Sequence, residues 1–382
     1  MLHCAPARSE TPLSETVTRR VRPSAPPGAR PCFSDENRRE WSIVRMAHIL
    51  NHTEVAMRII ALMNQKGGVG KTTTTANLGA ALAEAGKRVC LVDMDPQSHL
   101  TINYGIEPSD DLVSLYHVLV EQRSFLEAVQ KVDGGIALVP SSIDLAAAEI
   151  ELVGVLGREM LLKKRMESAQ HDFDFVLLDC PPSLGLLTIN ALAVAGEVII
   201  PMQPHFLALQ GVGKLLETVA LVARRMNPRL KVSGIVLTMF DSQTRLSAEV
   251  VNDLNGFIEQ AHGKNLPWSG ARLFKTKIRR NIKLAESPSF GQTILKYEPT
   301  SNGAADYRAL AREILELDES APQIEAPPVA QPDEKPSLMV MPVKPSALAA
   351  ARVDVPAVPR ECVRAAQRQV GGSAPMSAEA VA

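Results

Sequence analysis

Short apolar runs alternate with helical patterns along the middle of this 382-residue chain. We expect strands where about four to eight apolar residues follow one another, and helices where apolar residues recur every three or four positions. The predicted strands are residues 58–64, 87–93, 135–140, 175–181, 197–202 and 231–240. The predicted helices are residues 72–85, 186–195, 207–226, 246–260 and 304–317. This alternation predicts an α/β fold with a mainly parallel, twisted sheet that helices cover on both faces.

Proline separates the two ends of the chain from this alternating part. Residues 1–56 and 318–382 together hold 16 of the 27 prolines. Segments rich in proline and small polar residues do not bury enough apolar surface to offset the entropy of ordering them. We therefore predict disordered N- and C-terminal arms around one domain at 57–317. Met57 directly precedes the first predicted strand and is a candidate start of translation.

Composition excludes several classes of protein. No run of 18 apolar residues is present and the N-terminus has no apolar signal stretch, so we expect a cytoplasmic protein that does not enter a membrane. The five cysteines are scattered without CxxC spacing, which argues against a disulfide framework and against a zinc site. The formal net charge of −1 means that any affinity for nucleic acid must come from a local basic patch.

The stretch NQKGGVGKTTT, residues 64–74, connects the first predicted strand with the first predicted helix. Glycines let consecutive backbone N–H groups converge on phosphate oxygens at a helix N-terminus, whose dipole is positive. We expect Lys71 to reach the β and γ phosphates of ATP, Thr72 to bind Mg²⁺ and Thr73 to contact the α phosphate. Gln65 stands where the common GxxxxGK[ST] motif has its first glycine. The stretch still predicts a P-loop NTPase-like fold, with a phosphate cradle formed by Gly67, Gly68, Val69, Gly70, Lys71, Thr72 and Thr73.

Three aspartates stand at or just after the ends of predicted strands. Asp179 ends FVLLD, where a carboxylate is positioned to hold Mg²⁺ through water. Asp95 follows the strand that contains LVD, and we expect it to orient the water that attacks the γ phosphate. Asp93 has two interpretations from sequence, because an aspartate there contributes to the site or only forms a turn or caps a helix.

Four motifs together resemble the ParA/Soj family of partitioning ATPases, within the wider group that includes MinD. They are KGGVGKTT, LVDMDPQ, DCPPSLGLLTINAL and IRRNIKLAESPSFGQTIL, and the resemblance covers about residues 57–317. It implies that Lys66 crosses a dimer interface to the nucleotide of the other subunit, where its charge offsets repulsion between two triphosphates and assists hydrolysis. It also implies that Asn281 contacts adenine. The chain departs from the family at Arg279, where a proline is usual, and in PMQPHFLALQG at 201–211.

The resemblance further implies an ATP-bound homodimer that binds DNA without sequence preference, associates with the nucleoid and responds to a ParB-type partner. Six cations and no acid lie within residues 272–283. Phosphate contacts from such a segment suffice for non-specific binding, although a charge run is also typical of an ordinary solvated face. We expect DNA contacts from Arg245, Lys275, Lys277, Arg279, Arg280 and Lys283.

Other functions share parts of this pattern. A MinD-like ATPase that positions a different cargo needs an amphipathic C-terminal helix, which the ending GGSAPMSAEAVA does not predict. An iron protein of the nitrogenase type needs paired cluster-ligating cysteines, and Cys180 has no second cysteine to match it. A tyrosine kinase with a tyrosine-rich tail is excluded because residues 318–382 hold no tyrosine. An ATP-dependent amide synthase needs a substrate pocket for which the sequence has no motif, and ATP turnover would distinguish a non-hydrolysing scaffold.

Overall fold

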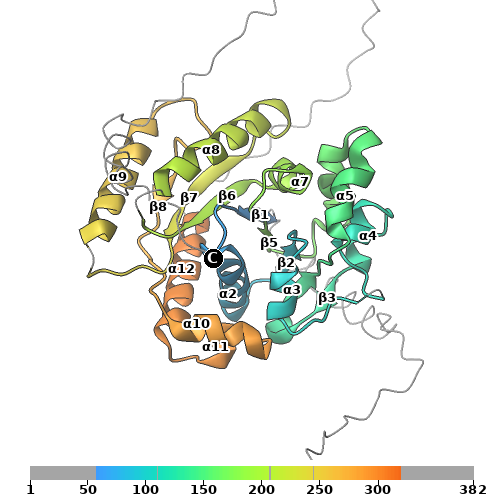
Figure 1. Ribbon diagram of the computed structural model, residues 1–382, viewed down its shortest axis with the longest axis horizontal. Coiled ribbons are helices and arrows are strands. Elements are labelled where there is room, and N and C mark those ends of the chain that lie inside the picture. The colour runs from blue at the N-terminus through green and yellow to red at the C-terminus, as the bar shows by residue number, and fades with distance from the viewer. Residues whose placement is uncertain (1–56, 110, 206–207, 244, 320–382) are drawn as a thin grey trace, which may run out of the picture. The chain divides into compact units, whose positions relative to one another are not determined.

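An eight-stranded sheet lies at the centre of the computed structural model, which describes residues 57–319 except 110, 206, 207 and 244 (Figure 1). The strand order is β3-β4-β2-β5-β1-β6-β7-β8, and all neighbours are parallel except β3 and β4. Of the predicted arms, 1–56 and 318–382, residues 1–56 and 320–382 lie outside the described residues, and residues 318 and 319 belong to the last helix. The strands are β1 (Arg58–Leu62), β2 (Val89–Asp93), β3 (Gln130–Lys131), β4 (Ala137–Val139), β5 (Phe175–Asp179), β6 (Glu197–Met202), β7 (Lys231–Leu237) and β8 (Arg272–Leu273).

Helices of very different length connect these strands. The α-helices are α2 (Lys71–Glu84), α3 (His99–Asn103), α4 (Leu115–Leu119), α5 (Leu145–Glu151), α6 (Leu161–Met166), α7 (Leu186–Val194), α8 (Ala208–Arg225), α9 (Arg245–Ala261), α10 (Ile282–Glu286), α11 (Ile294–Tyr297) and α12 (Asn302–Glu319). The 3-10 helices are η1 (Phe125–Glu127), η2 (Asp133–Gly135), η3 (Leu152–Gly154), η4 (Arg158–Met160), η5 (Glu167–Ala169) and η6 (Ser287–Phe290). Within the described residues, no helix combines the length and apolar character needed to cross a membrane.

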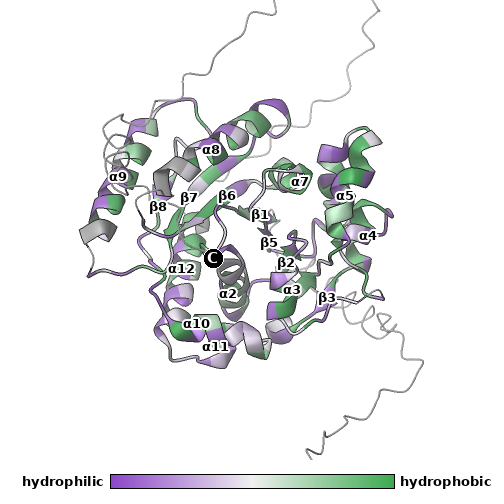
Figure 2. Ribbon diagram, in the orientation of Figure 1, coloured by the Kyte–Doolittle hydropathy of each residue, from purple (hydrophilic) through white to green (hydrophobic). Residues whose placement is uncertain are grey.

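The central strands are buried along their whole length. Every residue of β2, β5 and β6 is buried. Successive side chains of a strand point to opposite faces, so continuous burial means that both faces of these strands are covered. Figure 2 shows apolar residues along β6 and β7, and mixed apolar and polar residues along α8 and α9. The predicted α/β fold, with a mainly parallel sheet covered on both faces, is confirmed.

The register of the sheet brings the ends of three strands together. In β1 and β5, Leu62 pairs with Asp179, and in β2 and β5, Asp93 pairs with Asp179. All three strands are parallel, so the loops that leave their carboxyl ends emerge at one edge of the sheet. The glycine loop follows β1 at this edge. The topology therefore places the predicted phosphate loop beside both buried aspartates.

All the predicted strands except 197–202 are shorter in the structure, and the reason is visible at two of them. β1 ends at Leu62 because Asn64 already forms a turn, in which its Oδ1 accepts from the Lys66 backbone N–H at 3.0 Å. β7 ends at Leu237, before Thr238 turns toward the glycine loop. The sequence analysis did not predict β3, β8 or the short helices α3 to α6, α10 and α11. None of these elements exceeds seven residues, which is too short for a clear apolar period.

A charged network closes the amino-terminal end of β1. Arg58 Nε donates to Glu197 Oε1 at 2.9 Å, and the Ser233 hydroxyl donates to the other carboxylate oxygen. Burial alone would raise the pKa of Glu197, but the bonds from Arg58 and Ser233 and the nearby positive charges outweigh burial and lower it. The network joins β1, β6 and β7 across the middle of the sheet.

The last helix packs against the helix that follows the glycine loop. Figure 1 shows α12 beside α2. Thr74 Oγ1 and the Tyr307 hydroxyl lie 3.3 Å apart, and Asn77 Oδ1 accepts from the Ile294 backbone N–H at 2.7 Å. Residues more than 200 positions apart in the sequence thus hold α2 in place.

Candidate functional site

The glycine loop, residues 63–70, is fixed at its ends and open in its middle. Gly68 and Gly70 adopt φ of 72° and 83°, a left-handed conformation that side chains with a Cβ rarely adopt. A Cβ at Gly67 or Gly68 would meet no atom within 4 Å, so open space adjoins the backbone there. The carbonyl oxygen of Val69 accepts from Thr238 Oγ1 at 2.8 Å. The N-terminus of the 14-residue helix α2 follows, which makes the loop suitable for an anion.

Lys71 is the first residue of α2 and is only 8% exposed. Its Nζ donates to the Lys66 carbonyl oxygen at a long 3.4 Å. Burial lowers the pKa of Lys71, and the nearby carboxylates of Asp179 and Asp95 oppose this shift. The buried ammonium of Lys71 thus adds a positive charge to the glycine loop, beside the positive end of the α2 dipole.

Asp179 ends β5 and is 1% exposed. Its Oδ1 accepts from Thr75 Oγ1 at 3.1 Å, whereas its Oδ2 is buried and has no hydrogen-bond partner among the described residues. Burial and the charge of Asp93 raise the pKa of Asp179, and Thr72, Lys71 and Thr75 act in the opposite direction. A buried carboxylate oxygen without a hydrogen-bond partner, close to a threonine hydroxyl, is a suitable ligand for a hard cation such as Mg²⁺.

Asp93 is fully buried and holds the loop that leads into α3. Its Oδ2 accepts from the Thr101 backbone N–H at 2.8 Å and from the Thr101 hydroxyl at 2.7 Å. Its Oδ1 accepts from the Asp95 backbone N–H at 3.2 Å. Burial raises the pKa of Asp93 and these bonds oppose the rise. Of the two interpretations from sequence, the contacts match the local one, in which Asp93 shapes the turn that carries Asp95.

Asp95 is half-buried at the mouth of the site, and its charge acts on Lys71. Its Oδ1 accepts from the Gln97 backbone N–H at 3.0 Å, which holds the carboxylate on the turn after β2. The structure thus brings Lys71, Asp95 and Asp179 to one end of the sheet, as the sequence predicted.

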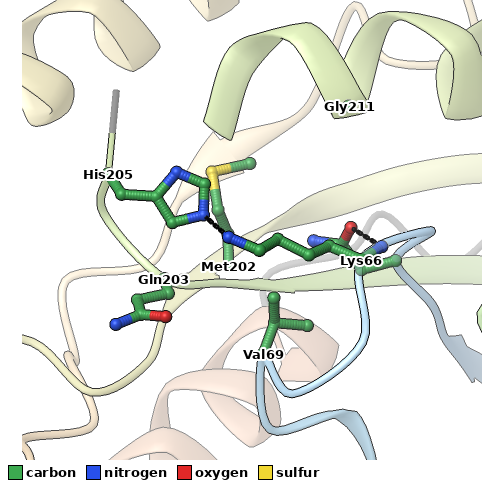
Figure 3. Close-up of a pocket in the computed structure, with 7 residues that line it drawn as sticks. Lys66, Val69, Met202, Gln203, His205 and Gly211 are labelled. Carbon is green, nitrogen blue, oxygen red and sulfur yellow. Dashed lines mark hydrogen bonds between the residues drawn. The ribbon is translucent and has the colours of Figure 1, made fainter. Parts of the chain in front are cut away.

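Lys66 extends away from this group. Figure 3 shows its side chain running over Val69 toward His205, and its Nζ contacts His205 Nε2. Burial, followed by the charge of Lys66, lowers the pKa of His205. The two side chains line a pocket together with Met202 at the end of β6, Gln203 just after it and Gly211 of α8. This is the segment in which the sequence departs from the family pattern.

Asn281 and the basic segment lie after β8. Asn281 caps α10, because its Oδ1 accepts from the Lys283 backbone N–H at 2.9 Å. Arg279 forms a bidentate pair with Asp306 whose shortest N–O distance is 2.6 Å, and the Lys283 Nζ lies 2.8 Å from a Glu286 carboxylate oxygen. The hydrogen bonds that Arg279 donates to Asp306 raise the pKa of Arg279.

The other cations of the basic segment differ in their surroundings. Lys275 and Arg280 are exposed. Lys277 is half-buried, and its Nζ lies 4.4 Å from the centre of the Phe240 ring. Arg245 is the first residue of α9, and its side chain lies outside the described part.

Sequence reasoning missed several residues that hold the site. Thr75 lies one helical turn after Lys71, so its side chain was predictable from helical spacing. Thr238 is the first polar residue after the apolar run of β7, which is a weaker signal. Thr101 and His205 carry no sequence signal, because their contacts depend on tertiary structure.

A parallel sheet with a glycine loop between its first strand and first long helix, and a buried carboxylate on the adjacent strand, defines the class of P-loop nucleotide-binding proteins. Residues 57–232 match the family model described as an AAA domain. The chain is 43% identical over 258 residues to the sporulation initiation inhibitor protein Soj of Bacillus subtilis, and this match covers 67% of this chain and 98% of that protein. It is 41% identical over 262 residues to the chromosome partitioning protein ParA of Myxococcus xanthus, across 68% and 89% of the two chains. The protein therefore belongs to the ParA/Soj family of partitioning proteins.

Solved structures agree with this fold. A cobyrinic acid a,c-diamide synthase from Mycobacterium smegmatis, with bound ATP analog and magnesium, superposes with a TM-score of 0.59 at 39% identity, covering 69% of this chain and 96% of that one. The cell division ATPase MinD of Pyrococcus furiosus superposes with a TM-score of 0.55 at 26% identity, covering 68% and 99%.

Proposed function

We propose that this protein is a partitioning ATPase that hydrolyses ATP to ADP and phosphate. The observation that carries the proposal is the open glycine loop at the N-terminus of α2, with a buried Lys71 near Asp179, whose Oδ2 has no hydrogen-bond partner among the described residues. Phosphate oxygens satisfy a lysine and a row of backbone N–H groups, and Mg²⁺ satisfies a carboxylate oxygen. The family relationship and a relative with bound ATP analog and magnesium support the same assignment.

Each residue of the site has a proposed role. The backbone from Gly67 to Thr73 surrounds the phosphates, and Lys71 neutralises their charge. Thr72 and Asp179, the latter through water, would hold Mg²⁺, which supplies positive charge to the triphosphate when bound. Asp95 orients the attacking water. Asn281 contacts adenine through the part of its side chain that does not cap α10.

Lys66 has a proposed role in a second subunit. Its contact with His205 shows that its side chain reaches well beyond the loop that carries it. We propose that, with ATP bound, Lys66 leaves His205 and contacts the nucleotide of the opposite protomer. Two triphosphates that face each other repel, and a lysine from each chain offsets that repulsion. ATP would thus favour the homodimer, and hydrolysis would release it.

The dimer presents the basic segment twice, which supports non-specific DNA binding and association with the nucleoid. Lys275, Lys277 and Arg280 are the proposed main contacts, with Arg245 as an addition. Arg279 and Lys283 belong to the same surface, although each shares its charge with an acid. A ParB-type partner would stimulate hydrolysis and thereby couple DNA release to cargo.

ATP binding and sedimentation of two lysine variants test the nucleotide site and the cross-subunit role, and ATP turnover of wild type tests the ATPase activity. We expect Lys71→Ala to abolish ATP binding, and Lys66→Ala to keep ATP binding but lose ATP-dependent dimers in sedimentation. Lys163, an exposed lysine on α6, provides the matched control, and Lys163→Ala should behave as wild type. Dimers of Lys66→Ala with ATP would contradict the cross-subunit role, and full ATP binding by Lys71→Ala would contradict the nucleotide site.

Two alternatives have specific support. One solved relative is described as a cobyrinic acid a,c-diamide synthase with bound ATP analog and magnesium, so ATP-dependent amide formation is a second candidate. Similarity to the cell division ATPase MinD supports the other alternative, an ATPase that positions a different cellular cargo. Retention on random-sequence DNA with ATP favours partitioning, whereas ATP turnover that requires a carboxylic acid substrate favours the synthase.

A further inference from the structure

Thr238 contacts the glycine loop from the carboxyl end of β7. It directly follows the last residue of this strand and is 2% exposed. Its Oγ1 donates to the Val69 carbonyl oxygen at 2.8 Å. Its methyl group lies 3.7 Å from the position that a Cβ on Gly70 would occupy. The hydroxyl and the methyl group of one buried side chain thus contact two consecutive residues of the loop.

The bond from Thr238 fixes the orientation of the peptide between Val69 and Gly70. No cis peptide bond occurs among the described residues, and in a trans peptide the N–H points opposite to the C=O. The Gly70 N–H therefore points away from Thr238. Within the part of the chain that the structure describes, this N–H has no hydrogen-bond partner, whereas the Gly70 carbonyl oxygen accepts from the Thr74 N–H at 2.9 Å. One donor of the loop is thus oriented and available to a ligand.

The backbone around Thr238 is itself held on two sides. The Thr238 N–H donates to the carbonyl oxygen of Met202, at the end of β6, at 2.8 Å. On the other side, the Ile278 N–H donates to the Leu237 carbonyl oxygen at 2.8 Å, and the Ile278 carbonyl oxygen accepts from the Phe240 N–H at 2.9 Å. These bonds fix the residues after β7 between β6 and the segment that follows β8.

Met239 indicates how firmly these residues, which we call the 238–240 turn, are fixed. Met239 is 39% exposed and adopts φ of 48°, a left-handed conformation that is uncommon for a residue with a Cβ. Such a conformation costs free energy and persists only where the surrounding structure imposes it, which is frequent at ligand sites. Here the hydrogen bonds of Thr238 and Phe240 on either side impose it. The turn is therefore a firm support for the glycine loop.

The 238–240 turn is also joined to the segment that carries Asn281. Phe240 pairs with Arg279 in a parallel bridge, and the Arg280 N–H donates to the Phe240 carbonyl oxygen at 3.3 Å. Asn281, which we propose to contact adenine, is the next residue. The turn therefore connects the phosphate end of the proposed nucleotide site with its adenine end.

We propose that Thr238 is a positioning residue for the nucleotide. Its hydroxyl orients the peptide between Val69 and Gly70 so that the Gly70 N–H donates to a phosphate oxygen, and the 238–240 turn keeps this donor at a fixed place relative to Asn281. A hydrogen bond to a charged phosphate is stronger than one to a neutral acceptor, so its orientation affects affinity directly. This role rests on the proposed function, because it requires ATP at the glycine loop.

The ATP affinity of three Thr238 variants, measured by calorimetry on the full chain, tests this proposal. Thr238→Val keeps the branched shape and removes the hydroxyl, and we expect it to weaken ATP binding by about tenfold. Thr238→Ala also lacks the hydroxyl and should show a similar loss. Thr238→Ser keeps the hydroxyl and should stay within about threefold of wild type. Affinity should therefore follow the presence of the hydroxyl and not the size of the side chain.

Thr218→Val on α8 is the matched control. The Thr218 hydroxyl also donates to a backbone carbonyl oxygen, that of Lys214 at 3.2 Å, but this bond lies within its own helix. The control variant should bind ATP as wild type does. Steady-state turnover adds a second measurement. In Thr238→Val, KM for ATP should rise about tenfold while kcat stays within about twofold, because the bond from Thr238 acts on binding and not on the attacking water.

Equal ATP affinity of wild type and Thr238→Val would overturn the proposal, and so would a loss in Thr238→Ser as large as the loss in Thr238→Val. A purely structural hydroxyl would give the first of these results, because it would lower only the unfolding temperature of the protein without nucleotide. Circular dichroism checks that each variant is folded, and Thr238→Ala against Thr238→Ser decides the question if Thr238→Val does not fold. A wild type that binds no ATP would refute the proposed function and this role together.

Discussion

Thr101 offers the sharpest test of how the site is held together. It is fully buried, and its hydroxyl donates to Asp93 at 2.7 Å while accepting from the Ser141 backbone N–H at 3.0 Å. One hydroxyl thus joins the loop after β2 to the loop after β4. Thr101→Val keeps the size and branching of the side chain and removes only this oxygen. Thr101→Ser keeps the oxygen and removes a methyl group.

The expected loss follows from the two bonds. A hydrogen bond to a buried carboxylate contributes about 1.5–3 kcal/mol, and a buried N–H left without a partner costs about 1–3 kcal/mol. Thr101→Val should therefore lower the free energy of unfolding by about 3 kcal/mol or more. Thr101→Ser should cost about 1 kcal/mol, because it deletes one buried methyl group.

Urea titration of wild type and both variants measures these differences. We also expect Thr101→Val to lower ATP turnover more than ATP binding, because Asp93 holds the backbone of Asp95, whereas the glycine loop does not touch Thr101 directly in any described bond. The reasoning is refuted if Thr101→Val is as stable as Thr101→Ser, since the hydroxyl would then contribute nothing.

Further predictions concern stability and hydrolysis. The lowered pKa of Glu197 means that its charge stabilises the folded state above its ordinary pKa of 4.5, so the advantage of wild type over Glu197→Gln should shrink as pH falls below about 4.5 in acid-unfolding titrations. Gly234→Ala should cost about 1–3 kcal/mol in thermal or urea unfolding, because its Cβ would overlap the Arg272 carbonyl oxygen; Gly256→Ala in α9 meets no atom within 4 Å and should be neutral or stabilising. Asp95→Ala should slow single-turnover hydrolysis by about 10² or more while ATP-dependent dimers persist, and rapid phosphate release from that variant would remove Asp95 from the mechanism.

Much of the fold was predictable because its signals are local. Continuous apolar runs marked β2, β5 and β6, which are buried along their whole length. The glycines of the loop marked a backbone whose N–H groups can converge on phosphate oxygens, and two of them adopt a left-handed φ in the structure. The two-residue strands β3 and β8 escaped prediction, since two residues carry no period.

The parts that sequence did not predict depend on contacts between distant residues. Arg279 stands in a window without acids, yet Asp306, 27 residues later, pairs with it. Thr101 meets Ser141 across 40 residues, and Lys66 meets His205 across 139. Local charge and spacing indicate the chemistry of a side chain, but its contacts depend on the tertiary structure.

The packing of α12 on α2 has a consequence for biosynthesis. Thr74 and Asn77 meet partners near the end of the domain, Tyr307 and Ile294. A ribosome delivers the amino-terminal half of the sheet well before these partners emerge. Until then, the side of α2 that packs against residues 294 and 307 has no partner in the growing polypeptide. A nascent chain that stops before residue 294 should therefore bind ATP poorly, although it already contains every proposed phosphate-contacting residue.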